Sequence, residues 1–176
     1  MPKRIENVPE QLLAEAGRQV AEQGYARTTV RSVAAACGIA VGTVYNYFPS
    51  KEHLIASFVA RDWKESLAAM DAGSRNSPEA CLHTIYEELQ AFARKHNALF
   101  TDPDAAKAVS GMLLPRHLQL REQLAAFIEP FAPSPDGFTA RFLAEALLTW
   151  TLSNTPFEQI YHILAKLIPD KKEDTL

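Results

Sequence analysis

The chain has 176 residues and a formal net charge of −3, with 47% apolar and 22% charged residues. This composition is globular and excludes a disordered chain, and the charge balance excludes a uniformly basic nucleic-acid coat. Two cysteines, Cys37 and Cys81, cannot form a disulfide framework, and the N-terminus does not resemble a signal peptide. We therefore expect a soluble, cytoplasmic protein.

Charge is spread unevenly along the chain. Residues 1–53 carry six Lys or Arg against five acidic residues, whereas residues 54–176 carry 12 against 16. This small asymmetry predicts that an anion-binding surface lies in the N-terminal part.

A run of 19 residues without charge, from Ser32 to Ser50, is close to the length of a membrane span. It contains Gly38, Gly42 and Pro49, which interrupt a helix. We therefore predict two short helices joined by a turn.

The first predicted helices are marked by their end signals. Asn7, followed by Pro9 and Glu10, predicts a capped start, and Gly24 predicts a stop. Thr29 predicts the cap of a second helix, residues 30–36, and the next helices are predicted over residues 41–47 and 51–70.

Downstream, proline in the first turn predicts helix starts at Pro78, Pro103 and Pro156, the last with a capping box between Thr155 and Glu158. Pro115 is predicted to break a helix pair within residues 112–128. Residues 130–137 form a predicted loop, and helices are predicted over residues 138–153 and 156–168. No stretch alternates with the period of a strand. The predicted fold class is all-α, with about nine helices.

Residues 29–51 predict a helix-turn-helix. Gly38 permits the sharp turn, and the outer face of the second helix of the pair carries small, hydroxylated and aromatic side chains without charge. Such a face fits a DNA major groove, with Val41 and Thr43 facing base edges and the Tyr45 and Tyr47 hydroxyls facing phosphates. The DNA-binding residues predicted from this pattern are Thr29, Val41, Gly42, Thr43, Tyr45, Asn46, Tyr47 and Lys51.

The run TTVRSVAAACGIAVGTVYNYFPSKEHL, residues 28–54, resembles the DNA-binding domain of the TetR family of bacterial transcriptional regulators. The resemblance covers about residues 8–55. It implies a homodimeric repressor that binds a palindromic operator of double-stranded DNA. It also implies a divergent C-terminal domain, where a small molecule binds and releases the DNA.

By the same resemblance, Arg31 matches a base- or phosphate-contacting arginine and Thr43 the hydroxyl of the recognition helix. Tyr45 and Tyr47 match phosphate-contacting aromatic residues, and Lys51 matches a phosphate-anchoring lysine. The sequence departs from the family pattern at Ala40, where Ser or Thr usually caps the helix, and at Val41, where Lys is common. The missing cap costs the recognition helix ~1 kcal/mol.

The predicted domains are a DNA-binding domain over residues 1–50, a ligand-binding and dimerisation domain over 51–170, and a flexible tail over 171–176. The predicted ligand-lining residues include no strong cationic cluster, so we expect a mainly apolar effector; they are Trp63, Tyr86, Phe100, Met112 and His117. The last two helices are expected to form a four-helix dimer interface through Phe142, Leu147, Trp150, Phe157, Ile160, Tyr161 and Leu164.

The sequence also bears on two other protein classes. A di-metal carboxylate enzyme needs Glu-x-x-His pairs, but Glu79/His83 and Glu158/His162 are spaced by four residues, and no phosphate loop or nucleophile elbow occurs. We therefore expect no enzymatic activity, no metal site and no cofactor. A helical protein-interaction adaptor, or an activator without small-molecule control, remains the alternative function.

Overall fold

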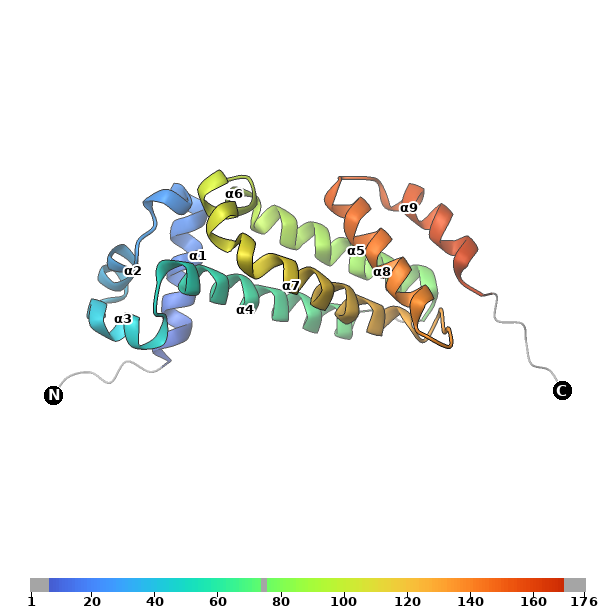
Figure 1. Cartoon of the computed structure of the whole chain (residues 1–176), viewed down its shortest axis with the longest axis horizontal. Helices are drawn as coiled ribbons and strands as arrows, with labels where there is room; N and C mark the ends of the chain where they lie inside the picture. Colours follow the sequence, from blue (N-terminus) through green and yellow to red (C-terminus); the bar gives the residue numbers. More distant parts are fainter. Residues whose placement is uncertain (1–6, 74–75, 170–176) are drawn as a thin grey trace. The chain divides into compact units, whose positions relative to one another are not determined.

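The computed structural model describes residues 7–73 and 76–169, and within α7 it describes residues 109–116 by their backbone alone. The described residues form nine α-helices and one 3₁₀ helix, with no strand among them (Figure 1). This confirms the predicted all-α fold class. In chain order the elements are α1 (Val8–Arg27), α2 (Val30–Cys37), α3 (Val41–Tyr47), α4 (Lys51–Ala72), α5 (Pro78–Lys95), α6 (Asn97–Phe100), α7 (Pro103–Ile128), α8 (Phe138–Leu152), α9 (Phe157–Leu164) and the 3₁₀ helix η1 (Ala165–Leu167).

Two compact units divide the chain. Unit 1 takes its residues from Met1–Glu65 and Arg94–Leu113, and unit 2 takes its residues from Ser66–Ala93 and Leu114–Leu176. Helices α4, α5 and α7 therefore contribute to both units. This division differs from the predicted boundary at residue 50, because α6 and the first parts of α4 and α7 pack with the N-terminal helices. The predicted tail, residues 171–176, lies outside the described residues.

Unit 1 has its core on one face of α1, which contacts α2 and α6. Leu12, Ala16 and Val20 of α1 are at most 3% exposed, which follows from apolar residues recurring at helical spacing. The other members of this core come from α2, α3, α4, α6 and α7, and include Val33, Ala34, Val44, Leu54, Ile55, Phe58, Leu99 and Ala105.

The uncharged residues 32–50 form most of α2, a turn and α3. No helix in the described parts of the chain is both long enough and apolar enough to cross a bilayer. The prediction of two short helices in this run is therefore confirmed.

The first helix lacks the predicted cap but breaks at the predicted glycine. Asn7 has a left-handed backbone (φ 57°) and makes no side-chain cap. Gly24 leaves helical geometry (φ 83°, ψ 168°), which costs glycine little, so the regular helix stops there as predicted. A short helical segment continues beyond this break to Arg27.

Pro115 does not separate two helices. α7 runs continuously from Pro103 to Ile128, which corrects the predicted break. A proline inside a helix removes a single intrahelical hydrogen bond, and the cost of about 3 kcal/mol is tolerated where the rest of the helix is retained.

Helix starts at the other prolines are mixed. Ser77 caps α5 by accepting the Ala80 amide at 3.1 Å, and Asp102 accepts the amides of Asp104 and Ala105 at 2.9 and 3.0 Å. The predicted box at Thr155 and Glu158 is wrong, because Pro156 is the N-cap of α9 and no side chain caps that helix. The amides of Gln159 and Ile160 bond the Pro156 carbonyl at 3.1 and 3.3 Å.

Unit 2 has a second core, formed by buried faces of α5, α8 and α9. Phe157 packs edge-on against the His83 ring, with centroids 4.7 Å apart, and the Tyr86 hydroxyl donates to the Thr155 carbonyl at 3.1 Å. The remaining fully buried side chains of this unit include Leu82, Ile85, Leu89, Leu124, Ile128, Leu143 and Leu147.

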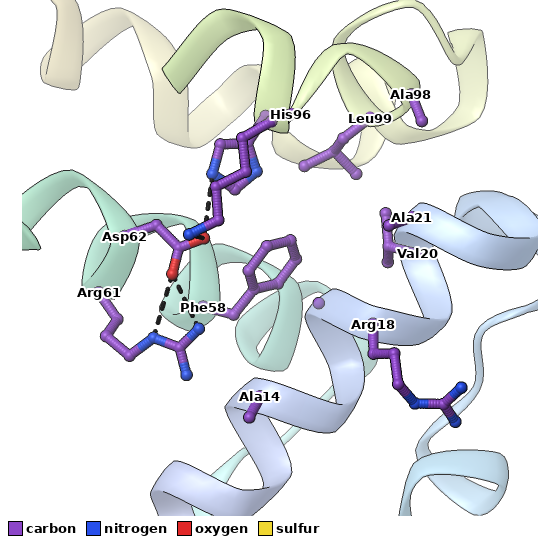
Figure 2. Close-up of a pocket in the computed structure, with 12 residues that line it drawn as sticks. Ala14, Arg18, Val20, Ala21, Phe58, Arg61, Asp62, His96, Ala98 and Leu99 are labelled. Carbon is purple, nitrogen blue, oxygen red and sulfur yellow. Dashed lines mark hydrogen bonds and ion pairs between the residues drawn. The ribbon is translucent and has the colours of Figure 1, made fainter. Parts of the chain in front are cut away.

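A buried carboxylate joins α4 to the α5–α6 junction inside unit 1. The Asp62 side chain is only 2% exposed and forms ion pairs with Arg61 at 2.8 Å and Lys95 at 2.9 Å. His96 Nε2 lies 3.2 Å from the same carboxylate (Figure 2). Burial opposes ionisation of Asp62, but the hydrogen bonds from Arg61 and Lys95 outweigh it and hold the pKa of this carboxyl below its usual range. Asp62 is therefore charged and compensated at neutral pH.

Replacing Asp62 by Ala is expected to destabilise the protein by about 3–5 kcal/mol, because it leaves the cations around a buried site without their counter-ion. The matched control is Glu65→Gln, since Glu65 also lies within 4 Å of Arg61 and Lys95 but is 64% exposed; it is expected to change stability by about 0.5 kcal/mol or less. Urea unfolding of both variants measures the difference, and equal losses would contradict a special role of the buried carboxylate.

The stability of the folded chain is expected to depend on pH through His96. Burial lowers the pKa of His96 to about 4, so between pH 4 and 6.5 the unfolded chain binds a proton there that the folded chain does not. Stability is therefore expected to fall by up to about 3 kcal/mol as pH drops from 6.5 to 4. The variant His96→Gln is expected to flatten this part of the stability profile, as followed by chemical unfolding at a series of pH values. A wild-type profile that is already flat in this window would disprove the prediction.

Candidate nucleic-acid interface

Helix α2 is held at both ends by local interactions. The Thr29 hydroxyl accepts the Ser32 amide at 2.9 Å, the Ser32 hydroxyl accepts the Thr29 amide at 3.0 Å, and Gly38 ends the helix with φ 66°. This confirms Thr29 as the predicted cap and Gly38 as the predicted turn residue. Arg31, in the first turn, is exposed.

Helix α3 exposes the residues that the sequence assigned to DNA. Only Val44 of this helix is fully buried, while Tyr45 and Tyr47 are each 49% exposed and Asn46 is exposed. Ala40 provides no side-chain cap, as its sequence implies. The result is a short helix with an uncharged outer surface of hydroxyl, amide and aromatic groups.

The other three predicted DNA residues of α3 are Val41, Gly42 and Thr43, which give the helix a surface with few protruding side chains. Thr43 is partly exposed, Val41 is partly exposed and packs on the unit 1 core, and Gly42 has open space where a side chain would lie. A groove-reading helix needs such a low-relief surface to approach base edges.

Lys51 is placed differently from Arg31. At the start of α4, the Ser50 hydroxyl accepts a hydrogen bond from the His53 amide at 3.3 Å. The Lys51 ammonium donates a hydrogen bond to the Tyr25 carbonyl at 2.6 Å. The same ammonium lies 3.7 Å from the centre of the Tyr25 ring. The Thr29 side chain is likewise engaged, in its capping box.

Six of the nine predicted DNA residues fall into two groups. Arg31, Tyr45, Asn46 and Tyr47 present exposed side chains, whereas Thr29 and Lys51 bond within the protein. Sequence reasoning missed Tyr25, which is 5% exposed and bonds both Lys51 and Glu52. No spacing rule links residues 25 and 51, because their contact is tertiary.

Residues 12–58 match the family model described as bacterial regulatory proteins, tetR family. This N-terminal segment therefore carries the sequence pattern of the TetR family. This match contains α2, α3 and most of the unit 1 core residues that hold them.

Three similar proteins illustrate the extent of the likeness. The HTH-type transcriptional repressor KstR of Rhodococcus jostii is 42% identical over 31% of this chain and 24% of its own length. The nucleoid occlusion factor SlmA of Haemophilus ducreyi is 28% identical over 73% of this chain and 63% of its own. The chain thus spans less than two thirds of these curated relatives. The crystal structure of the TetR family repressor AlkX from Dietzia sp. shares the fold with a TM-score of 0.62, at 16% identity over 95% of this chain and all of that one.

The predicted ligand-lining residues fall into both units. Trp63 is buried and Phe100 is 41% exposed in unit 1, while Tyr86 is buried in unit 2. His117 of unit 2 is exposed and paired with Glu145 at 3.0 Å. The side chain of Met112 lies outside the described residues.

Unit 1 contains a hollow of about 320 Å³ beside the buried ion cluster (Figure 2). Small residues of α1, Ala14, Gly17 and Ala21, form one side, and Phe58 and Leu99 provide an apolar base. None of the predicted ligand-lining residues borders this hollow.

The predicted dimer residues also separate. Phe142 and Trp150 of α8 are 48% and 55% exposed, whereas Leu147, Phe157, Ile160 and Leu164 are at most 6% exposed within the single chain. Tyr161 is half-buried and borders two surface hollows of about 630 and 330 Å³.

No three His, Cys, Asp or Glu side chains within the described ranges gather closely enough to hold a metal ion. The Glu and His residues of α5 and α9 instead make ordinary contacts, such as His83 with Glu87 at 3.4 Å.

Proposed function

We propose that this chain is a DNA-binding transcriptional regulator, most simply a repressor that binds a palindromic operator as a homodimer. The observation that carries the proposal is the exposed, uncharged face of α3 inside the segment that matches the TetR family model. The names of the relatives KstR and AlkX, both repressors, support the same assignment.

In this proposal α3 enters the major groove. Thr43 and Asn46 face base edges, because hydroxyl and amide groups read donor and acceptor patterns there, and Val41 offers an apolar contact for a thymine methyl. The hydroxyls of Tyr45 and Tyr47 and the guanidinium of Arg31 face phosphates. Two copies bind two half-sites only if their recognition helices are separated by about one helical turn, roughly 34 Å, or a multiple of it.

The partner in the dimer is proposed to cover the exposed apolar face of α8. Phe138 and Phe142 have ring centroids 6.1 Å apart and are more than 45% exposed, and Trp150 lies two turns beyond Phe142. Neighbouring exposed apolar residues of unit 2 are Leu152, Ile163 and Leu167. A surface of this kind is typical of an isologous interface.

A small, mainly apolar effector is proposed to release the regulator from DNA. Any such ligand must bind the DNA-free geometry more tightly, and linkage then requires DNA to weaken ligand binding by the same factor. AlkX, a relative of the same fold, carries a title that implicates it in n-alkane biodegradation, which supports an apolar class of effector.

A second candidate is a DNA-binding protein without small-molecule control. The SlmA relative, which matches 73% of the chain, is named as a nucleoid occlusion factor and not as a ligand-controlled repressor. Selection from a random pool of duplexes tests the shared claim: enrichment of an inverted repeat supports DNA binding, and no enrichment contradicts it.

Arg31→Ala is expected to weaken binding to the selected duplex and to reduce the log–log salt slope by about 0.9 per protomer, since one phosphate contact is lost. Lys166→Ala, which removes an exposed cation of η1 in unit 2, is the matched control and is expected to leave the slope unchanged. Fluorescence anisotropy over a salt series measures both. Equal effects of the two substitutions would show that only net charge matters.

Trp150→Glu is expected to convert the dimer to a monomer, because a partner would have to bury the new charge, and to reduce operator binding with it. Leu118→Glu is the matched control, since Leu118 is 54% exposed on α7, outside the α8 face. Sedimentation velocity reports the oligomeric state. A Trp150→Glu protein that remains dimeric would eliminate this surface as the interface.

A further inference from the structure

We propose that Lys51 is a positioning residue that fixes the α1–α2 connection through Tyr25, and that it is not itself a phosphate contact. The inference rests on the proposed DNA-binding function. It changes the role that the family resemblance implies for this lysine. It also identifies Tyr25 as the residue through which α4 holds the α1–α2 connection in place.

The first observation is how fully the ammonium is engaged. Lys51 Nζ donates to the Tyr25 carbonyl at 2.6 Å and lies 3.7 Å from the Tyr25 ring centre. A lysine ammonium has three N–H donors. One of them bonds the Tyr25 carbonyl, and the ammonium also makes a cation–π contact with the Tyr25 ring. Burial also lowers the pKa of Lys51, as expected for a cation drawn out of water.

The second observation is that α4 holds Tyr25 at two points. The Tyr25 hydroxyl donates to Glu52 Oε1 at 3.4 Å, while Lys51 holds the carbonyl and the ring. Tyr25 is only 5% exposed, so its ring cannot leave this site without opening the core. Lys51 and Glu52, the first two residues of α4, therefore both contact the same buried residue, Tyr25.

The third observation is the backbone beside Tyr25. Because Gly24 breaks α1 at φ 83°, carbonyls at the end of that helix need other donors. The Thr28 amide lies 3.3 Å from the Gly24 carbonyl and 3.2 Å from the Tyr25 carbonyl, and the Thr28 hydroxyl donates to Gly24 at 2.9 Å. Lys51 completes this set, in the manner of a cation that caps a helix C-terminus.

These contacts connect α4 to α2 over a very short path. Thr29, the cap of α2, follows Thr28 directly, and Arg31 lies in the first turn of α2. Loss of the Lys51 contact therefore frees the connection from which Arg31 projects. DNA affinity then falls because the interface is less well ordered, with no change in the number of phosphates neutralised.

The experiment compares Lys51→Met with Arg31→Ala on the duplex selected from the random pool. Lys51→Met is expected to lower affinity by threefold to tenfold while the salt slope stays at the wild-type value. Arg31→Ala is expected to reduce the slope by about 0.9 per protomer. A slope that falls equally for Lys51→Met would overturn the proposal, because it is the signature of a lost phosphate contact.

Two further measurements separate positioning from direct contact. In a double-mutant cycle with Tyr25→Leu, which removes the ring, the two substitutions are expected to be non-additive in DNA affinity; additivity would overturn the proposal. Hydrogen exchange of the Thr28 amide in the DNA-free protein is expected to accelerate in Lys51→Met and to stay at the wild-type rate in Arg31→Ala.

The exchange measurement also distinguishes this proposal from the function on which it rests. If the wild-type chain selects no duplex, the DNA-binding proposal fails, but the Thr28 amide still reports whether Lys51 orders the α1–α2 connection. Unchanged exchange in a folded Lys51→Met protein would overturn the positioning role whatever the chain binds.

Discussion

Burial of one face of α1 is the constraint on which the candidate interface depends. Leu12, Ala16 and Val20 are removed almost completely from water, and this packing holds α2, α4 and α6 around the same helix. Helices of seven and eight residues, the lengths of α3 and α2, are not stable alone. Their polar outer faces are therefore presented in a fixed position only because Val33 and Val44 are anchored in that core.

Two sets of polar contacts connect helix ends inside unit 1. Tyr25 and Thr28 satisfy the break in α1, and Asp62 gathers Arg61, Lys95 and His96 where α4 meets the α5–α6 junction. Both sets lie along α4. Because a buried polar group without its partner costs 1–3 kcal/mol, these contacts restrict how α4 moves relative to α1.

For Lys51, at the start of α4, the motif indicates that the residue matters, and the structure shows which groups its side chain contacts. The sequence correctly marks Lys51 as a residue with a specific role, but residue type and spacing cannot say whether its ammonium faces solvent or protein. In the structure it meets a carbonyl and a ring from a segment 26 residues away. The same limit applies to α8 and α9, where an apolar stripe does not reveal which residues one chain buries and which it leaves for a partner.

The sequence by itself determined the all-α class, the limits of α3, the cap at Thr29 and the turn at Gly38, because caps, glycine conformation and helical periodicity are local properties. Tertiary structure alone decided that α7 continues through Pro115, that Leu147 and Leu164 are core residues, and that Tyr25 receives Lys51. These outcomes depend on which faces meet in space, and packing between distant segments is not written in the spacing of any single helix.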